Sequence, residues 1–258
     1  MANIRSFLNW DRDYYEINRE ERNLAAIFYH LLLINDNLKR FLQTISCSSP
    51  IDPDNMGIYF EYSYLRDLWF NIQEGNDIKR ELIYKFLNPA NLKDLKAMSV
   101  LELNQYFGAV PKPSREFIQS PGNWSIEKYA GNITDNQEFL KICKFKWAFN
   151  AKPDIVIHLS KNTAICIECK FESGEGTYPT KPSEMREFQN RGIDLVTQTS
   201  LQKYIMEDLL GIETKFVFLV KKANSKSLTH DTLLWREAFS NLITDGCPQF
   251  IREWIKRI

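Results

Sequence analysis

Cysteine and histidine are scarce in this chain of 258 residues. The five cysteines are odd in number and scattered, which argues against a disulfide framework. Cys166 and Cys169 formally match a C-x-x-C motif, but residues three apart on a strand point to opposite faces and cannot share a metal ion. The three histidines have no spacing typical of a metal site. We therefore expect no disulfide-stabilised fold and no metal centre built on cysteine or histidine.

Long hydrophobic runs and a net charge are also absent. No stretch approaches the roughly 20 apolar residues of a membrane span, and the first residues lack the basic and apolar regions of a signal peptide. The 33 basic and 33 acidic residues cancel, so the composition does not indicate a protein that binds nucleic acid through bulk positive charge. A local basic surface could still serve that purpose. With 44% hydrophobic residues, we expect a soluble, cytoplasmic protein with a full core.

Two apolar, β-branched segments dominate the second half of the chain. Residues 154–159 and 163–171 are typical of buried strands. The Ser-Lys-Asn sequence between them favours a turn, so the sequence predicts a β-hairpin. A turn centred on Lys161 would place Asp154 directly opposite Glu168, with their Cβ atoms about 4.5–5.5 Å apart.

Charged side chains in strands this apolar need a chemical reason. Two carboxylates so close repel each other unless a cation lies between them, and a hard divalent cation such as Mg²⁺ prefers oxygen ligands. Lys170 lies two residues beyond Glu168, and therefore on the same face of the strand. A buried salt bridge between Lys170 and the carboxylates is the alternative explanation. A two-residue turn would pair Asp154 with Cys169, turn the carboxylates to opposite faces and exclude the site.

The segments Pro153-Asp154 and Glu168-Cys169-Lys170 resemble the active site of the PD-(D/E)xK nuclease superfamily. The resemblance implies an α/β protein with a restriction-endonuclease-like core, a four-stranded mixed sheet flanked by helices, with a helical insertion. It also implies that Asp154, Glu168 and the Cys169 backbone carbonyl bind Mg²⁺, for which Mn²⁺ can substitute, and that Lys170 acts on the attacking water or the phosphate. The expected activity is Mg²⁺-dependent phosphodiester hydrolysis by a DNA endonuclease of restriction or defence type. The alternatives are an RNA- or branched-DNA-cleaving nuclease of the same fold, or a non-catalytic module that binds nucleic acid or protein.

The order of elements that the resemblance implies is a helix, three antiparallel strands, a helix and a strand. Lys144–Phe149 alternates between polar and apolar residues and predicts the first core strand, and residues 214–220 predict the last. Residues from about 188 to 210 have helical spacing, which ends at Gly211. The chain is thus divided into an N-terminal helical part of the core at 1–45, a helical insertion at 46–137, the nuclease core at 138–222 and a C-terminal helical segment at 223–258. The insertion could recognise substrate, add packing or form the surface of a homodimer.

Two helices are expected to add further side chains to the site. Gln198 lies on the inward stripe of the crossover helix, with Gln202 one turn later, and several nuclease branches of the superfamily carry a glutamine there. Two partly solvated glutamines at a helix edge are the alternative. Glu21, near the start of the first helix, could bind the metal or orient water, although the helix dipole also explains acidic residues in a first turn. Glu20 and Glu138 are rivals for that role.

Overall fold

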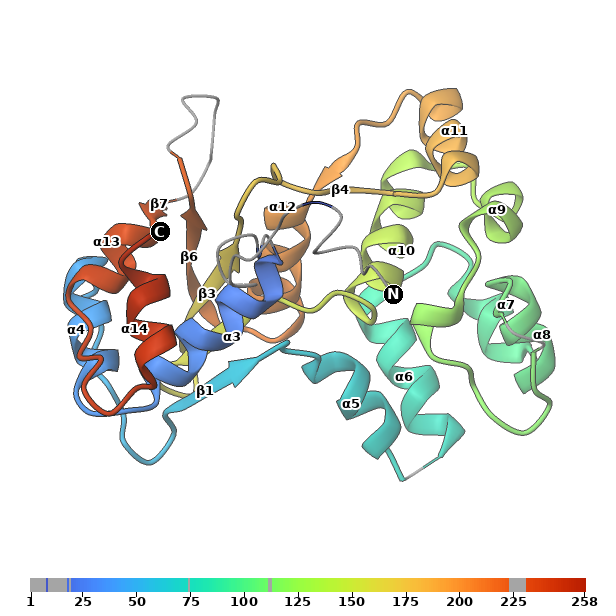
Figure 1. Ribbon diagram of the computed structural model, residues 1–258. Coiled ribbons are helices and arrows are strands. Elements are labelled where there is room, and N and C mark those ends of the chain that lie inside the picture. Colours follow the sequence, from blue (N-terminus) through green and yellow to red (C-terminus); the bar gives the residue numbers. More distant parts are fainter. Residues whose placement is uncertain (1–7, 9–17, 19, 74, 111–112, 223–230) are drawn as a thin grey trace, which may run out of the picture.

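The apolar segments predicted as a hairpin form the centre of a mixed β-sheet (Figure 1). The computed structural model describes residues 8, 18, 20–73, 75–110, 113–222 and 231–258. Within this part of the chain, the strands of the sheet are β1 (Gly57–Phe60), β2 (Ile155–His158), β3 (Thr163–Cys169), β6 (Glu213–Val220) and β7 (Asp231–Leu234). They lie in the order β1-β2-β3-β6-β7. The β1–β2 and β2–β3 pairs are antiparallel, whereas β3–β6 and β6–β7 are parallel.

The hairpin of β2 and β3 has the predicted register. Ile155 lies opposite Ile167, and one step further along the same register Asp154 comes opposite Glu168. The prediction of a turn centred on Lys161 is therefore confirmed. The register is favoured by the isoleucines, because a slip by one residue would turn those of one strand from the α3 side of the sheet to the α10 side.

The first strand of the sheet is β1, and the strand predicted at Lys144–Phe149 is wrong. That segment forms the last turns and the C-terminal cap of helix α10 (Asn136–Ala148). Asp135 caps the start of α10 by accepting a hydrogen bond from the Glu138 N–H at 2.8 Å. Apolar side chains are buried along the whole helix. Six residues that alternate between polar and apolar also fit a helix that is buried on most sides, and tertiary packing decides between the two.

The elements nevertheless follow one another in the expected order. Helix α3 (Glu21–Leu32) precedes β1, β2 and β3, and the crossover from β3 to β6 contains helix α12 (Gln198–Lys203). The long helical segment lies inside the β1–β2 connection, at residues 61–153, rather than between the first helix and the first strand. The range 46–137, predicted as a helical insertion, thus contains a strand of the sheet.

The sheet has five strands in the described residues, where four were predicted. The additional strand is β7, which pairs in parallel with the end of β6, Val217 lying opposite Asp231. Asp231 also forms an ion pair with Lys215, with 2.8 Å between Oδ2 and Nζ. Residues 231–234 were predicted to be helical but form this strand. Leu233 and Leu234 lie opposite Leu219 and Val220 and extend the apolar part of the sheet.

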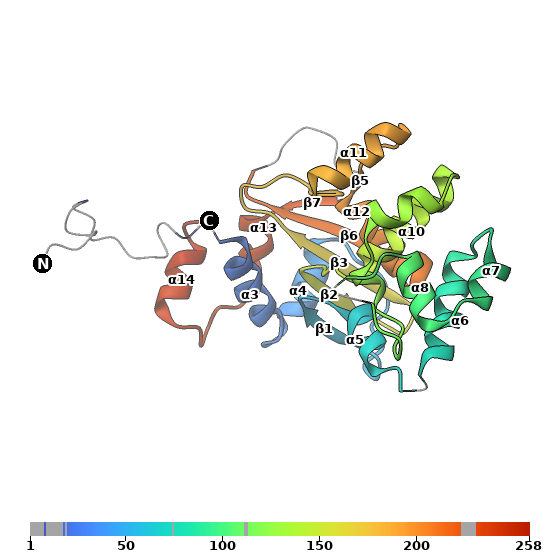
Figure 2. The same cartoon turned by 90° about the vertical axis from the view of Figure 1, so that its right-hand side faces the viewer.

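Helices cover both faces of the sheet (Figure 2). Alternate side chains of β2 and β3, such as Ile155 and Ile167, pack against a layer of four helices. These are α3, α4 (Asn37–Thr44), α13 (Trp235–Ser240) and α14 (Gln249–Ile255). The intervening side chains, such as Val156 and Cys166, pack on the opposite face against α10 and α12. No helix in the described ranges is long and apolar enough to cross a membrane.

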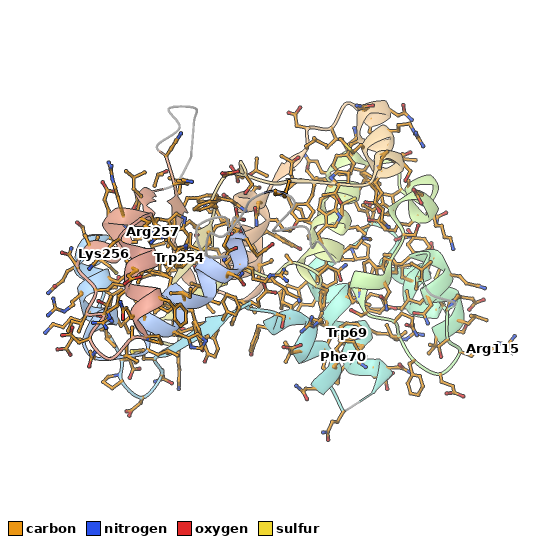
Figure 3. The ribbon with its side chains drawn as sticks, viewed as in Figure 1. Trp69, Phe70, Arg115, Trp254, Lys256 and Arg257 are labelled. Carbon is orange, nitrogen blue, oxygen red and sulfur yellow. The ribbon has the colours of Figure 1, made fainter. Side chains whose placement is uncertain are left out.

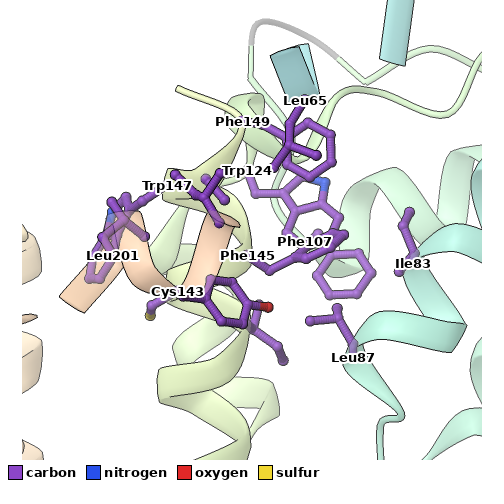
Figure 4. Close-up of a cluster of buried hydrophobic side chains, with 14 of the residues drawn as sticks. Leu65, Ile83, Leu87, Phe107, Trp124, Cys143, Phe145, Trp147, Phe149 and Leu201 are labelled. Atoms are coloured by element: carbon purple, nitrogen blue, oxygen red, sulfur yellow. The ribbon is translucent and has the colours of Figure 1, made fainter. Parts of the chain in front are cut away.

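The helical segment between β1 and β2 contributes aromatic side chains to the core on the α10 side of the sheet (Figure 4). Its elements are α5 (Tyr64–Asn71), α6 (Asn76–Leu87), α7 (Leu92–Ala97), α8 (Val100–Tyr106), η1 (Pro121–Asn123), α9 (Ile126–Tyr129) and η2 (Ala130–Asn132). Phe107 and Trp124 stack with ring centroids 3.9 Å apart and planes 8° apart, and Phe145 of α10 packs beside Trp124. This core joins the helical segment to the sheet, because side chains of α10 pack against the helical segment and against the sheet.

The crossover is not the single helix predicted for residues 188–210. Helix α11 (Pro182–Arg191) ends at Gly192, whose φ of +64° suits glycine. Strand β5 (Val196–Thr197) then pairs with β4 (Thr177–Tyr178), and α12 begins only after it. A π-helical turn, η3 (Tyr204–Leu209), continues α12. Gly211, with φ of +68°, follows this turn, as the sequence predicted.

Candidate active site

Asp154 and Glu168 meet on one face of the sheet. Asp154 directly precedes β2, and its Oδ2 accepts a hydrogen bond from the backbone N–H of Cys169 at 2.8 Å. Glu168 lies in β3 and is only 3% exposed. A buried carboxylate needs partners that replace its hydration.

The partners of Glu168 come from its own strand and from α12. Lys170 Nζ lies 3.1 Å from Glu168 Oε1. The side-chain amides of Gln198 and Gln202 donate to Oε1 and Oε2 of Glu168, respectively. Gln202 is 2% exposed, and its own Oε1 lies 3.7 Å from the Sγ of Cys166. Both oxygens of Glu168 are thus held in fixed positions.

Lys170 is fixed at both its backbone and its side chain. Its N–H donates to the carbonyl of Leu219 in β6 at 2.7 Å, and its carbonyl accepts from Trp235 Nε1 at 2.9 Å. Its ammonium lies between Glu168 and Glu21, with 3.7 Å to Glu21 Oε1. Trp235, at the start of α13, could not be identified from sequence, because its role is to hold a backbone carbonyl and no motif marks it.

Glu20, Glu21 and Glu138 were candidates for a further carboxylate at the site, and of these Glu21 reaches it. Its Oε2 accepts hydrogen bonds from the Phe171 N–H at 2.8 Å and the Ser173 hydroxyl at 2.7 Å. Glu20 instead caps the start of α3, and Glu138 accepts from the Ala90 N–H at 3.1 Å. Glu21 therefore anchors the loop after β3 as well as facing Lys170.

The same loop is tied to α12 by a residue whose role could not be predicted. Glu175 Oε1 accepts from the N–H of Thr199 at 2.9 Å and from its hydroxyl at 2.6 Å. Gln198 N–H donates to the Gly176 carbonyl at 2.8 Å. These contacts fix the first turn of α12, and with it the position of Gln198. From sequence, Glu175 is either a solvated loop residue or a further carboxylate near the metal, and its contact with Thr199 could not be predicted because that partner is distant in the chain.

The site carries more negative than positive charge. Burial, and then the nearby Glu168, raise the pKa of the Asp154 carboxyl to about 8. Burial alone lowers the pKa of Lys170, but Glu168 and Glu21 outweigh it, so the pKa lies above its ordinary value and the side chain is an ammonium. Without a metal, Asp154 therefore keeps its proton near neutral pH, while Glu168 and Glu21 face the ammonium of Lys170. A divalent cation would favour the ionised form of Asp154.

The oxygen atoms present fit a hard cation such as Mg²⁺ or Mn²⁺ rather than a softer ion that prefers nitrogen or sulfur ligands. In an extended strand the N–H and C=O of one residue point to the same side. Since the Cys169 N–H points to Asp154, its carbonyl lies on that side too. The described residues contain no cluster of three or more His, Cys, Asp or Glu side chains placed to hold a metal. A cation here would therefore use Asp154, Glu168, the Cys169 carbonyl and non-protein oxygens.

The comparisons with known proteins add no relative. No protein-family model, no curated protein and no solved structure gives a significant match to this chain. The function is therefore argued from the geometry of Asp154, Glu168 and Lys170 and from the motif that these residues form.

Proposed function

We propose that this protein is a metal-dependent phosphodiesterase, most simply a DNA endonuclease of the PD-(D/E)xK type. One observation carries the proposal: the hairpin register brings half-buried Asp154 to the buried pair of Glu168 and Lys170, as the motif requires. A buried ion network is costly to form, because desolvation of the charges opposes their attraction. A catalytic role explains why three ionisable side chains lie at the end of apolar strands.

The chain's own residues divide the work of hydrolysis. Asp154, Glu168 and the Cys169 carbonyl would hold Mg²⁺ or Mn²⁺, which as a Lewis acid lowers the pKa of water and stabilises charge on a phosphate. Lys170, held as an ammonium, stabilises negative charge on the phosphate and orients the attacking water. Gln198 and Gln202 keep Glu168 in position. Glu21 orients Lys170 and the loop that follows it.

The reaction adds water across one phosphodiester bond. The water oxygen attacks phosphorus, and the bond from phosphorus to the leaving oxygen breaks. One proton of the water ends on the leaving oxygen, and the other is released with the phosphomonoester. DNA is the substrate that the PD-(D/E)xK motif favours, and a cytoplasmic homodimer would present two such sites to the two strands of a duplex.

A cleavage assay tests the proposal directly. The protein is incubated with plasmid, single-stranded DNA and RNA in Mg²⁺, Mn²⁺ or EDTA, beside Lys170→Ala and the control Lys93→Ala, which changes an exposed lysine of α7. We expect cleavage that requires a divalent metal, is lost in Lys170→Ala and persists in Lys93→Ala. Cleavage that ignores the chelator or survives Lys170→Ala would overturn the mechanism. If the protein binds nucleic acid without metal and cleaves none of the substrates, a non-catalytic binding module would be favoured instead.

A further inference from the structure

An aromatic cleft lies beside the candidate active site, on the outer edge of the sheet. Its volume is about 680 Å³, and it is bounded by β1, the start of α5, the β2–β3 turn and the segment that leads into β6. In Figure 1, β1 runs toward the start of α5. Its lining includes the side chains of Tyr59, Tyr62, Tyr64, His158, Lys161 and Asn71. A cleft of this size is in the range of small-molecule sites.

The rings are arranged as a platform with two open faces. Tyr62 and Tyr64 stack with centroids 5.8 Å apart and planes 7° apart. Tyr59 meets the His158 ring edge-on at 5.5 Å, and the Tyr62 hydroxyl lies 3.1 Å from His158 Nε2. Tyr62 and His158 therefore form a fixed base for the other two rings. Tyr59 and Tyr64 are 47% and 48% exposed, so each offers a large aromatic surface to solvent.

This platform lies on the same face of the sheet as the catalytic carboxylates. Tyr59 is directly opposite Val156 in the β1–β2 pair, and residues opposite each other share a face. Asp154, Val156 and His158 are spaced two residues apart along the chain, so their side chains point to the same face of the sheet. Tyr59 and His158 therefore share the face of Asp154. Four residues of strand correspond to about 13 Å between Asp154 and His158.

The segment after β1 is tied to the backbone of the active site. The Glu61 N–H donates to the Asp154 carbonyl at 2.8 Å, and the Tyr62 N–H donates to the Pro153 carbonyl at 2.9 Å. The position of the tyrosines is thus coupled to that of Asp154 through two short backbone hydrogen bonds.

The charges that line the cleft are largely compensated. Glu61 forms ion pairs with Arg22 and Lys152, at 3.0 and 3.5 Å. Asp67 is paired with Arg66 at 3.0 Å and accepts from the Ser63 hydroxyl. Burial lowers the pKa of His158, which favours its neutral form. The surface is therefore aromatic and close to neutral, with an exposed lysine, Lys161, at its rim.

We propose that this cleft binds an unpaired base of the nucleic-acid strand whose phosphate is held at Asp154, Glu168 and Lys170. The inference rests on the substrate class proposed above and adds a subsite to it. Bases stack on tyrosine without regard to sequence, so the subsite selects for single-stranded or locally opened nucleic acid rather than for a sequence. For a strand that keeps the stacked spacing of duplex DNA, about 3.4 Å per nucleotide, 13 Å corresponds to about four nucleotides. Lys161 is placed to contact a phosphate of the same strand.

Binding measured without catalysis tests the subsite. A fluorescent oligothymidine is titrated in EDTA with wild type, Tyr59→Ala, Tyr64→Ala and Tyr64→Phe, and an abasic strand of equal length is titrated with wild type. The control Phe70→Ala removes a ring of α5 that is 71% exposed and outside the cleft (Figure 3). We expect each alanine variant to weaken binding about ten-fold. Tyr64→Phe and Phe70→Ala should bind like wild type, and the abasic strand should bind as weakly as the alanine variants do.

The outcomes separate this inference from the proposed activity. Equal affinity of the abasic and thymidine strands for wild type would overturn it, even if a variant failed to fold. The inference would also be overturned if wild type bound no strand, or if Tyr59→Ala and Tyr64→Ala both bound as tightly as wild type. Tyrosine-dependent binding without cleavage of any substrate would support the subsite and reject the nuclease activity. Cleavage without tyrosine-dependent binding would support the activity and reject the subsite.

Discussion

The ammonium of Lys170 lies 3.1 Å from a carboxylate oxygen of Glu168, and both side chains are buried. Glu168→Ala would leave this ammonium, the Gln198 amide and the Gln202 amide without their acceptor. We expect a loss of about 3–5 kcal/mol in the free energy of unfolding, the range for breaking one partner of a buried pair. Urea denaturation in EDTA measures it.

A surface ion pair provides the control for this loss. Glu207→Ala breaks the pair between Lys203 and Glu207, in which the lysine side chain is largely exposed. Its effect should stay within about 0.5 kcal/mol. Similar losses in Glu168→Ala and Glu207→Ala would show that the buried contacts of Glu168 add little to stability.

Gln202 should act on the reaction only through Glu168. Gln202→Leu keeps the buried volume but removes the donor to Glu168 Oε2. We expect Mn²⁺ affinity and cleavage to fall about 10–100-fold, as for other groups that orient metal ligands. Calorimetry with Mn²⁺ and the cleavage assay measure the two effects. Gln189→Leu, an exposed change on α11, should alter neither. A Gln202→Leu variant with normal metal affinity would show that Glu168 needs no such support.

Three glutamates can be ranked by single substitutions. Glu21→Gln removes the charge that faces Lys170 and weakens the acceptor for Phe171 and Ser173. We expect cleavage to fall about ten-fold or more. Glu20→Gln and Glu138→Gln should retain wild-type rates, because their side chains bond elsewhere. If cleavage fell only in Glu138→Gln, the role proposed for Glu21 would belong to Glu138 of α10. That result would contradict the contacts seen in the structure.

The hairpin could be predicted from sequence because its signals are local. All of them lie within eighteen residues and predict the same register. They are the isoleucine pairs, the polar turn and the spacing of Asp154, Glu168 and Lys170. The first strand could not be predicted, because Gly57–Phe60 is short and its side chains are only partly buried at the sheet edge. Nothing local indicates that its partner β2 lies almost a hundred residues further along the chain.

The error at Lys144–Phe149 has the same physical origin. Alternation over six residues is too short to exclude a helix, and the burial of α10 on most sides removes the polar stripe that would reveal one. In contrast, Gln198 does contact Glu168, although the helix that carries it begins ten residues later than predicted. The inward position of a glutamine is a local signal. Gly192 is also a local signal for a helix end, whereas the β4–β5 pairing that precedes α12 joins segments separated in the chain.

The aromatic core between β1 and β2 should be essential for stability. Phe107→Ala removes a fully buried ring that stacks on Trp124. We expect a loss of about 3–5 kcal/mol in the free energy of unfolding. Phe117→Ala, at a position 60% exposed, should cost less than about 0.5 kcal/mol. Thermal or urea unfolding compares the two. A loss for Phe107→Ala as small as that for Phe117→Ala would mean that the helical segment does not share the cooperative unfolding of the sheet.

Asp154 should make the metal-free protein less stable as the pH rises. Its folded pKa of about 8 lies above the ordinary value of 3.8, because of burial and of the charge on Glu168. Between these pH values the folded chain keeps a proton that the unfolded chain has released. The free energy of unfolding therefore falls as the pH rises from about 4 to about 8. The nearby Lys170 and Glu21 are included in this balance, the former lowering the pKa and the latter raising it.

Asp154→Asn should remove this dependence, since the amide neither titrates nor carries charge. Urea denaturation in EDTA should find the variant about 1 kcal/mol or more above wild type at pH 8.5 and close to it at pH 4. Added Mg²⁺ should stabilise wild type at pH 8.5, because a ligand that binds only the folded state favours it. The variant should gain little from Mg²⁺. An equal gain in both proteins would place the cation elsewhere, and an unchanged pH dependence in the variant would show that another group titrates.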